Sequence, residues 1–561
     1  MDFSTMTSLT KARIIVRILN VHMGPLKTFN REIHNLRTLA HSFYGATNAE
    51  PYSSTSVKRF QDIPGPRGIY SIPYTKYGFP KAYLVFRELH KKYGRIVRVK
   101  MGFQWHVILF DPEFIYTTIS HEGKYPVRIV PPIMTAYAKR HGFGKSFSSA
   151  QGKDWSNLRG IIQHKLKPTE ISKYIPIQSA CTDDLVHWLS MNNDEKLDVE
   201  DTIRRFVSDA TAAVGFNAKM GFLKDKGKNE ENEIFLKSTR QMMHMIGESF
   251  YKFPFYLFFK TNFYNRYEEA ANYVYRYGFK RIKESTTGSS ENKQELNILN
   301  SLLTDKSMPV DIIPYAITGM VFSGLETTTR PILWTLWLLG SHKEKQQKIY
   351  EEITTNVPDG ELTFDRLRHL PYLKACIKEL IFPSLNGTVR VIPDDMTLDN
   401  YHIPKGTPVH FGLNSLCNSE EYFVCPEQFI PERWLPEEKD RNKIRLMAMC
   451  VQPFGFGKRN CPGRRIAEQL IHITLIKILQ NFELSVPDEA RDVGLYYHTL
   501  AFPEKPIKIN FTKRKRDFKE LAPHLNSCRR VKPVHRCRTV KMIVKILKTR
   551  DKKKTLQGSD S

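Results

Sequence analysis

Residues 454–463 read FGFGKRNCPG, and this stretch decides the fold. Its one cysteine, Cys461, lies in a glycine-rich bend, and an amphipathic pattern follows from residue 464 to residue 479. The pattern predicts a helix that begins just after Cys461, where backbone N–H groups and the helix dipole favour a thiolate. Phe454 would shield the sulfur, and the glycines would let the backbone pass close to a flat ligand. Arg459 could meet an anionic group of that ligand.

The same stretch resembles the haem-binding signature of the cytochrome P450 family, Phe-x-x-Gly-x-Arg-x-Cys-x-Gly. Every fixed position matches, at Phe454, Gly457, Arg459, Cys461 and Gly463. The alternative is a surface turn with a chance cysteine, which so many matches in so short a stretch disfavour. The resemblance implies haem b with Cys461 as the thiolate ligand of the iron. It also implies a mainly α fold with a small β region, in which haem lies between a distal and a proximal helix.

The chain divides into three parts. Residues 1–62 are basic and poor in acids, with a short amphipathic pattern typical of a mitochondrial transit peptide; a disordered tail is the alternative. The prolines that follow predict a stiff linker into a haem-thiolate domain over residues 63–512. Residues 513–561 form a basic extension that we expect to be disordered. No stretch of 18 or more apolar residues is present, so the sequence predicts no transmembrane helix.

Composition narrows the class of partner. The formal net charge of +27 suits an acidic protein or an anionic membrane surface. Nucleic acid is disfavoured, because the basic extension has almost no aromatic residues on which bases could stack. The eight cysteines include no Cys-x-x-Cys pair, which disfavours zinc ribbons and a disulfide scaffold.

Secondary-structure patterns place a second candidate pair of side chains. Residues 81–93 predict a helix, and residues 96–101 and 106–109 predict a strand pair. Trp155 and Arg159 are four residues apart in a helical pattern, so they share one face. They could simply pack together on the surface. The family resemblance implies instead that they bind a haem propionate.

A long apolar helix is predicted over residues 312–339, interrupted by a polar cluster. Gly324 weakens this helix, and threonine hydroxyls can bond carbonyls one turn back, so we expect a local widening. The segment resembles the oxygen-activating motif of the family, with Ser323 departing at its first position. By resemblance, Gly324 lies at the haem, and Glu326 and Thr327 relay protons through water. A kinked core helix with self-satisfied threonines is the alternative.

One family motif is broken. Glu379 opens the Glu-x-x-Arg pattern, but position 382 is Phe382 and the run that follows looks short. In the family, this glutamate, its arginine and a second arginine, here Arg433, form a buried charge network; we therefore expect Glu379 to be left with Arg433 alone, a weakened arrangement. Either the variant is natural, or a few residues have been lost from the sequence. Arg390 resembles a further propionate-binding arginine.

The mitochondrial branch of the family takes electrons from an adrenodoxin-type ferredoxin. Lys374 and Lys378 match the lysines of that branch that contact the ferredoxin, although a solvated basic face is the alternative. The aromatic run over residues 250–267 could be core, channel wall or a membrane-dipping surface. The resemblance implies a monooxygenase acting on a lipophilic, steroid-like or xenobiotic substrate, peripheral on the matrix side of the inner mitochondrial membrane. The rival hypothesis is a silent relative that binds haem or lipid without turnover.

Overall fold

The computed structural model describes most of the predicted haem-thiolate domain and little outside it. The described residues are 57–67, 81–101, 104–142, 149–192, 197–250, 252, 254–287, 298–358, 360–380, 388–435, 441–497 and 500–515. Arg59 begins the compact unit to which every helix and strand below belongs. Almost all of the predicted transit segment, and residues 516–561 of the extension, lie outside the described residues.

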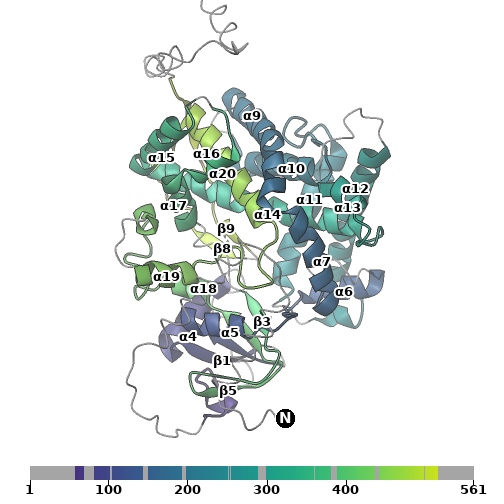
Figure 1. Cartoon of the computed structure of the whole chain (residues 1–561), viewed down its shortest axis with the longest axis vertical. Helices are drawn as coiled ribbons and strands as arrows, with labels where there is room; N and C mark the ends of the chain where they lie inside the picture. The colour runs from purple at the N-terminus through teal and green to yellow at the C-terminus, as the bar shows by residue number, and fades with distance from the viewer. Residues whose placement is uncertain are drawn as a thin grey trace, which may run out of the picture. The chain divides into compact units, whose positions relative to one another are not determined.

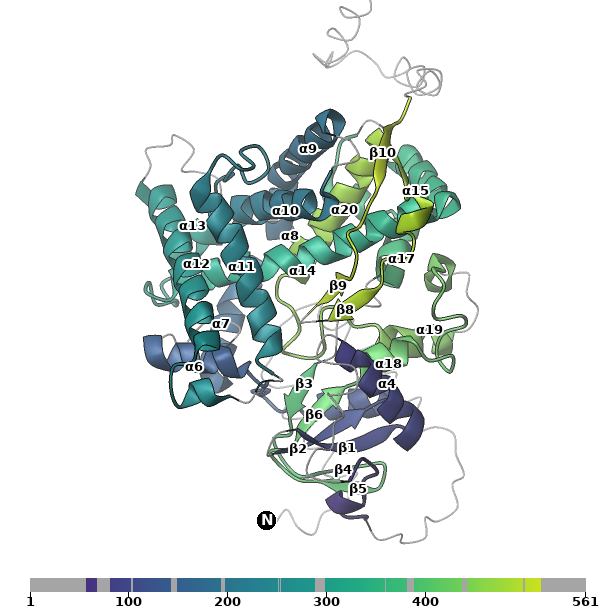
Figure 2. The same ribbon diagram turned by 180° about the vertical axis from the view of Figure 1, so that it is seen from behind.

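A long helix, α14 (Ile313–Ser341), runs through the helical region (Figures 1 and 2). It packs against α10 (Val199–Gly215), α12 (Asn262–Thr287) and α20 (Arg464–Asn481). Side chains on all its faces are buried, as expected for a helix whose sequence is apolar all round. The helix is continuous, so the predicted interruption near Gly324 does not break it.

The longer of the other helices follow the 3.6-residue apolar period of the sequence, and those labelled η are short 3-10 helices. They are η2 (Phe60–Asp62), α4 (Ala82–Tyr93), α5 (Pro112–Ser120), α6 (Pro132–His141), α7 (Gly152–Lys165), α8 (Pro168–Ile171), η4 (Ser172–Tyr174), α9 (Ile175–Met191), α11 (Glu230–Glu248), η5 (Phe255–Leu257), α13 (Ile298–Leu303), α15 (Lys343–Asn356), α16 (Phe364–Arg368), α17 (Pro371–Leu380), α18 (Leu413–Cys417), η6 (Pro431–Trp434), α19 (Arg441–Cys450) and η7 (Asp488–Ala490). The predicted mainly α fold with a small β region is confirmed.

The β region contains a four-stranded sheet in the order β1-β2-β6-β3. Its strands are β1 (Ile96–Met101), β2 (Gln104–Leu109), β6 (Pro408–Phe411) and β3 (Val389–Val391). β1 and β2 pair antiparallel, which confirms the predicted strand pair, and β2 lies parallel to β6. Both ribbon views show this sheet beside α4, apart from α9, α10 and α15 (Figures 1 and 2).

Short antiparallel pairs complete the described strands. These are β4 (Met396–Leu398) with β5 (Tyr401–Ile403), β8 (Leu495–Tyr497) with β9 (Ala501–Pro503), and β7 (Phe482–Ser485) with β10 (Asn510–Lys513). The last pair carries the folded unit slightly past the predicted boundary at residue 512. Nε of Arg514 donates to the carbonyl of Leu479 over 2.9 Å, and its guanidinium lies 3.9 Å from the ring centroid of Tyr350. Within the part of the chain that the structure describes, no helix combines the length and apolar character needed to cross a bilayer.

Candidate functional site

The cysteine loop joins α19 to α20 and folds back on itself. The backbone N–H of Cys461 donates to the carbonyl of Phe454 over 2.8 Å, which closes the loop just before α20 begins. Gly455 and Gly457 both have positive φ, at +73° and +60°, a conformation that glycine adopts without strain. Cys461 is accessible and lines a pocket. The predicted loop-to-helix arrangement is therefore present in the structure.

Gly457 meets a carboxylate that sequence reasoning missed. A Cβ at residue 457 would overlap the carboxylate of Glu122. One oxygen of that buried carboxylate accepts from the backbone N–H of Lys458 over 2.8 Å, and the other accepts from Nε of Arg390 over 2.9 Å. Gly457 thus makes room for Glu122, a role different from the predicted close passage of a flat ligand. Glu122 follows a helix end more than 300 residues away, where nothing in the sequence marks it.

Opposing effects act on the Cys461 thiol. The sulfur is open to the pocket, but the protein packed around it removes bulk water and raises the pKa of the thiol, while the backbone N–H groups of Gly463 and Arg464 and the guanidinium groups of Arg159 and Arg128 act to lower it. The N–H groups at the start of α20 therefore favour the thiolate as predicted, although burial outweighs them in the protein alone. A cation bound at the sulfur would add the missing stabilisation of the thiolate.

Guanidinium groups surround the pocket near Cys461. Arg128, Arg159 and Arg459 all line it, and none has an ion pair among the described residues. Burial, with repulsion from other arginines, lowers the pKa of Arg128 to about 10 and that of Arg459 to about 9. Arg459 is buried, Arg159 is half-buried and Arg128 is exposed. Cations that line a pocket without carboxylate partners fit a ligand that carries anionic groups, as the two propionates of haem do.

The predicted pair on α7 lies on this wall. Trp155 and Arg159 both line the pocket, which confirms that they share a face. The guanidinium of Arg459 stacks 4.4 Å from the ring centroid of Trp155 and donates to the carbonyl of Ala150 over 3.1 Å. Arg159 donates to the backbone carbonyl of Asn460 over 2.5 Å. Arg390 is held by Glu122 and does not line the pocket, so its predicted contact with a propionate stays a prediction.

Arg128 was not predicted. It lies in an extended stretch between Pro126 and Pro131, where a single cation among apolar residues was the available signal. A charged residue in such a stretch needs a partner or solvent, so its position would have suggested an anionic ligand.

The pocket, of about 470 Å³, extends from the cysteine loop to α14. Gly324 and Thr327 of α14 line it, as predicted. The hydroxyl of Thr327 donates to the carbonyl of Ser323 over 2.6 Å, and a Cβ at residue 324 would lie 3.2 Å from the methyl group of Thr211 on α10. Pro331 has no N–H, so the carbonyl of Thr327 lacks the donor that an α-helix normally supplies four residues further on.

Glu326 turns away from the pocket wall. It is buried, its side chain does not belong to the lining, and Nη2 of Arg330 donates to it over 3.0 Å. Thr327 and Gly324 therefore line the pocket, whereas Glu326 does not. Its part in a proton relay stays a prediction.

The partial charge network is better satisfied than predicted. One oxygen of Glu379 accepts from Nε of Arg433 and from the backbone N–H of Ile430, both over 3.1 Å. The other oxygen accepts from Nε1 of Trp434 over 2.6 Å. Among the described residues Glu379 therefore keeps Arg433 as its one ion-pair partner, as expected, and the indole and a backbone N–H supply two further donors. Phe382 lies outside the described residues.

The lysines predicted to dock a ferredoxin both lie on α17. Nζ of Lys374 donates to the carbonyl of Arg368 over 2.5 Å, and Nζ of Lys378 lies 3.9 Å from the ring centroid of Trp434. Burial lowers the pKa of Lys378 to about 8, and the nearby charge of Arg464 adds to this effect. Each lysine therefore has a contact within the fold, and their role in docking stays a prediction.

Comparison with known proteins agrees with this geometry. A family model described as "Cytochrome P450" matches residues 66–511. "Cytochrome P450 10" of Lymnaea stagnalis is 29% identical over 491 residues, which cover 84% of this chain and 89% of the relative. The mitochondrial 1,25-dihydroxyvitamin D(3) 24-hydroxylase of Mus musculus is 27% identical over 449 residues, covering 78% of this chain and 85% of the enzyme. The mitochondrial cholesterol side-chain cleavage enzyme of Mesocricetus auratus is 27% identical over 490 residues, covering 83% and 92%.

Proposed function

Because the chain belongs to the cytochrome P450 family of monooxygenases, whose members bind haem through a cysteine thiolate, we propose that Cys461 is that ligand in this protein. The chain inserts one oxygen atom of dioxygen into a lipophilic, steroid-like or xenobiotic substrate. One observation carries this proposal: Cys461, the unpaired arginines and Thr327 all line the same pocket. When bound, a thiolate-ligated haem supplies the activation of dioxygen.

The arginines hold and orient the cofactor. Arg128, Arg159 and Arg459 supply guanidinium groups for the propionates, and the Trp155 ring supports the guanidinium of Arg459. Arg390 does not contact the pocket and acts indirectly. It bonds Glu122, and Glu122 in turn accepts from the backbone N–H of Lys458 in the cysteine loop. The cofactor would thus relieve the crowding of positive charge that lowers the pKa of Arg459.

Thr327 is the candidate for proton delivery at the pocket. Its hydroxyl proton is directed to the carbonyl of Ser323, so Oγ1 keeps lone pairs that can accept from water. The carbonyl of Thr327, freed by Pro331, offers that water a second acceptor. Glu326 is the neighbouring residue in the sequence. It would return a proton to the water at Thr327 once its side chain leaves Arg330.

The protein works in mitochondria with a ferredoxin. The basic leader, the mitochondrial enzymes among its relatives and the lysines of α17 support this assignment. An acidic adrenodoxin-type ferredoxin would meet Lys374 and Lys378, and their charges would set the encounter rate more than the final affinity. The proposed location is peripheral, on the matrix side of the inner membrane.

An exposed aromatic patch supports peripheral membrane association. Phe250, Phe255, Leu257, Phe258 and Phe259 are all exposed, and Phe258 is 78% accessible. A cluster of exposed apolar side chains of this kind marks a surface that contacts a membrane or a partner. Nearby lysines suit anionic lipid headgroups.

The second candidate is a silent relative that binds haem or lipid without turnover. Phe382 in place of an arginine favours it, whereas the three donors on Glu379 favour a braced fold. The absorption spectrum of the reduced, carbon monoxide-bound protein tests the first proposal. A thiolate-type Soret band, together with oxidised product in a ferredoxin-supported assay, supports the monooxygenase. Its absence from a folded, haem-containing protein supports the silent relative.

A further inference from the structure

A buried arginine on α14 has no part in the site described so far. Arg330 is 0% exposed and lines the pocket, three residues after Thr327. Residues three apart share a helix face and differ by roughly 4.5 Å along the axis, so the two side chains face the same wall. Burying a guanidinium is costly unless its donors are used.

Only one nitrogen of this guanidinium has hydrogen-bond partners in the described part of the chain. Nη2 of Arg330 donates to Glu200 over 2.8 Å and to Glu326 over 3.0 Å. Nε and Nη1 are buried and have no partner among the described residues. The guanidinium carbon lies 4.3 Å from the ring centroid of Phe502, on the strand that follows pocket-lining Leu500. A buried donor that is left without an acceptor destabilises the fold.

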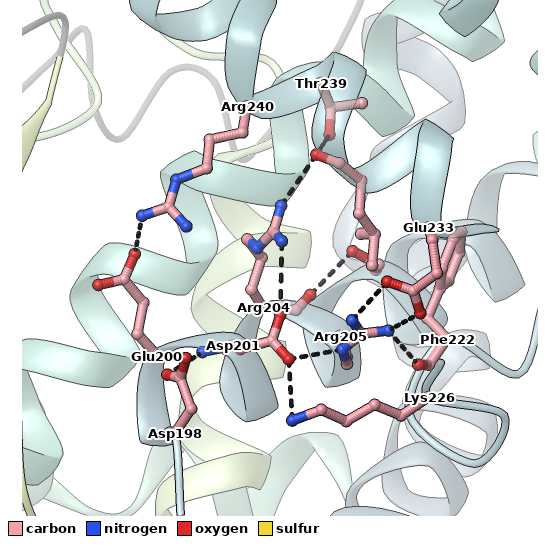
Figure 3. Close-up of polar contacts among 12 residues, drawn as sticks. Asp198, Glu200, Asp201, Arg204, Arg205, Phe222, Lys226, Glu233, Thr239 and Arg240 are labelled. Atoms are coloured by element: carbon pink, nitrogen blue, oxygen red, sulfur yellow. Dashed lines mark hydrogen bonds and ion pairs between the residues drawn. The ribbon is translucent and has the colours of Figure 1, made fainter. Parts of the chain in front are cut away.

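Arg330 shares its two carboxylate partners with other arginines. Glu200 is shared with Arg240, at 2.5 Å, and Glu326 lies 4.0 Å from Arg204. Three guanidinium groups face these two carboxylates, but Arg204 also bonds Asp201 over 3.4 Å, and Oε1 of Glu326 has no hydrogen-bond partner among the described residues. Figure 3 shows the outer part of this cluster, where Arg240 points to Glu200 and Arg204 turns partly towards Asp201. An oxygen acceptor arriving from the pocket would meet the two unused donors of a charged guanidinium, which bond a carboxylate more strongly than a neutral oxygen.

We propose that Arg330 binds an oxygen acceptor of a lipophilic ligand, through Nε and Nη1, and prefers a carboxylate to a neutral carbonyl. The rest of the wall is mainly apolar, with Met242, Ile317, Val321 and Leu500 among its residues. The ligand is therefore an amphipathic molecule with a long apolar body and an oxygen-bearing group. The inference rests on the proposed function only in that the same pocket takes the substrate.

Titration calorimetry on the haem-loaded protein tests this assignment with three ligands of one chain length: dodecanoate, methyl dodecanoate and dodecyltrimethylammonium. The wild type should bind dodecanoate at least tenfold more tightly than the ammonium compound, with the ester between them. Arg330→Lys keeps a cation for Glu200 and Glu326 but removes the unused donors, and it should weaken dodecanoate binding about tenfold. Arg240→Lys is the matched control, since Arg240 bonds the same Glu200 without lining the pocket.

Each outcome decides the inference. Loss of affinity for dodecanoate alone assigns recognition to the charge, and equal loss for the ester assigns it to the carbonyl oxygen; both support the proposal. Dodecanoate affinities within twofold of the wild type in Arg330→Lys, equal weakening by Arg240→Lys, or no dodecanoate binding by the wild type would overturn it. The carbon monoxide spectrum of each variant is recorded separately. A protein that lacks the thiolate band but shows the Arg330 effect would refute the proposed function and leave this inference standing.

Discussion

The carboxylate of Glu122 occupies the space in which a side chain at Gly457 would have to lie. One contact thereby connects the end of α5 to the cysteine loop, because the same carboxylate bonds the N–H of Lys458 and the guanidinium of Arg390. Gly457 is thus needed for an intramolecular contact with Glu122, apart from any role it has in binding a cofactor.

Gly457→Ala should displace Glu122 and leave Arg390 without its buried carboxylate. Breaking a buried ion pair costs about 3–5 kcal/mol, so we expect the free energy of unfolding to fall by about 3 kcal/mol or more. Denaturant unfolding of the purified protein measures this. Gly406→Ala is the control, since Gly406 has a φ of +81° and no atom within 4 Å of an added Cβ. It should cost only about 1–2 kcal/mol of backbone strain, and equal losses in both variants would contradict the role of Glu122.

Lys378 predicts a specific pH dependence of stability. Burial disfavours the charged form and lowers the pKa of Lys378 in the folded protein to about 8, from an ordinary value of 10.5. Between these pH values the unfolded chain holds a proton that the folded chain has released, so this group makes the protein more stable as pH rises. Relative to Lys378→Met, the wild type should gain about 1–2 kcal/mol from pH 7 to pH 10, less than the full shift because the side chain is partly exposed. Denaturant titrations at both pH values measure the difference, and parallel behaviour would refute the assignment.

Lys374→Glu should slow reduction by an adrenodoxin-type ferredoxin several-fold at low salt, because it reverses a charge on the proposed docking face. The effect should shrink as salt screens the charges. Stopped-flow reduction at two ionic strengths measures it. Lys405→Glu reverses an exposed charge in the turn between β5 and β6 and should leave the rate unchanged. Equal slowing in both variants would indicate a general charge effect and not a docking site.

Thr327→Ala should preserve haem binding and uncouple dioxygen consumption from product formation, because the hydroxyl that faces the pocket is lost. We expect a tenfold or greater fall in product per dioxygen consumed, in line with the usual size of general acid–base effects. Thr329→Ala is the matched control: its hydroxyl bonds the carbonyl of Leu325 over 2.7 Å on the same helix but does not line the pocket. Normal coupling in Thr327→Ala would remove this hydroxyl from the proton path.

Local sequence patterns predicted those features of the fold and the site that are determined by residues close together in the sequence. The cysteine loop, the shared face of Trp155 and Arg159, and the long apolar helix all follow from spacing within one segment. Glu122 and the extra donors to Glu379 could not be predicted in this way, because each acts on residues of a distant segment. Arg330 was equally hidden, since its buried environment is created by α10 and β9.

The central claim is that Cys461 holds haem iron as a thiolate in this chain. The difference spectrum of the reduced protein with and without carbon monoxide tests it most directly, in the wild type and in Cys461→Ser. We predict a thiolate-type Soret band in the wild type and its complete loss in Cys461→Ser, with denaturant unfolding confirming that the variant is folded. A haem-loaded wild type without that band, or a variant that retains it, would contradict the account.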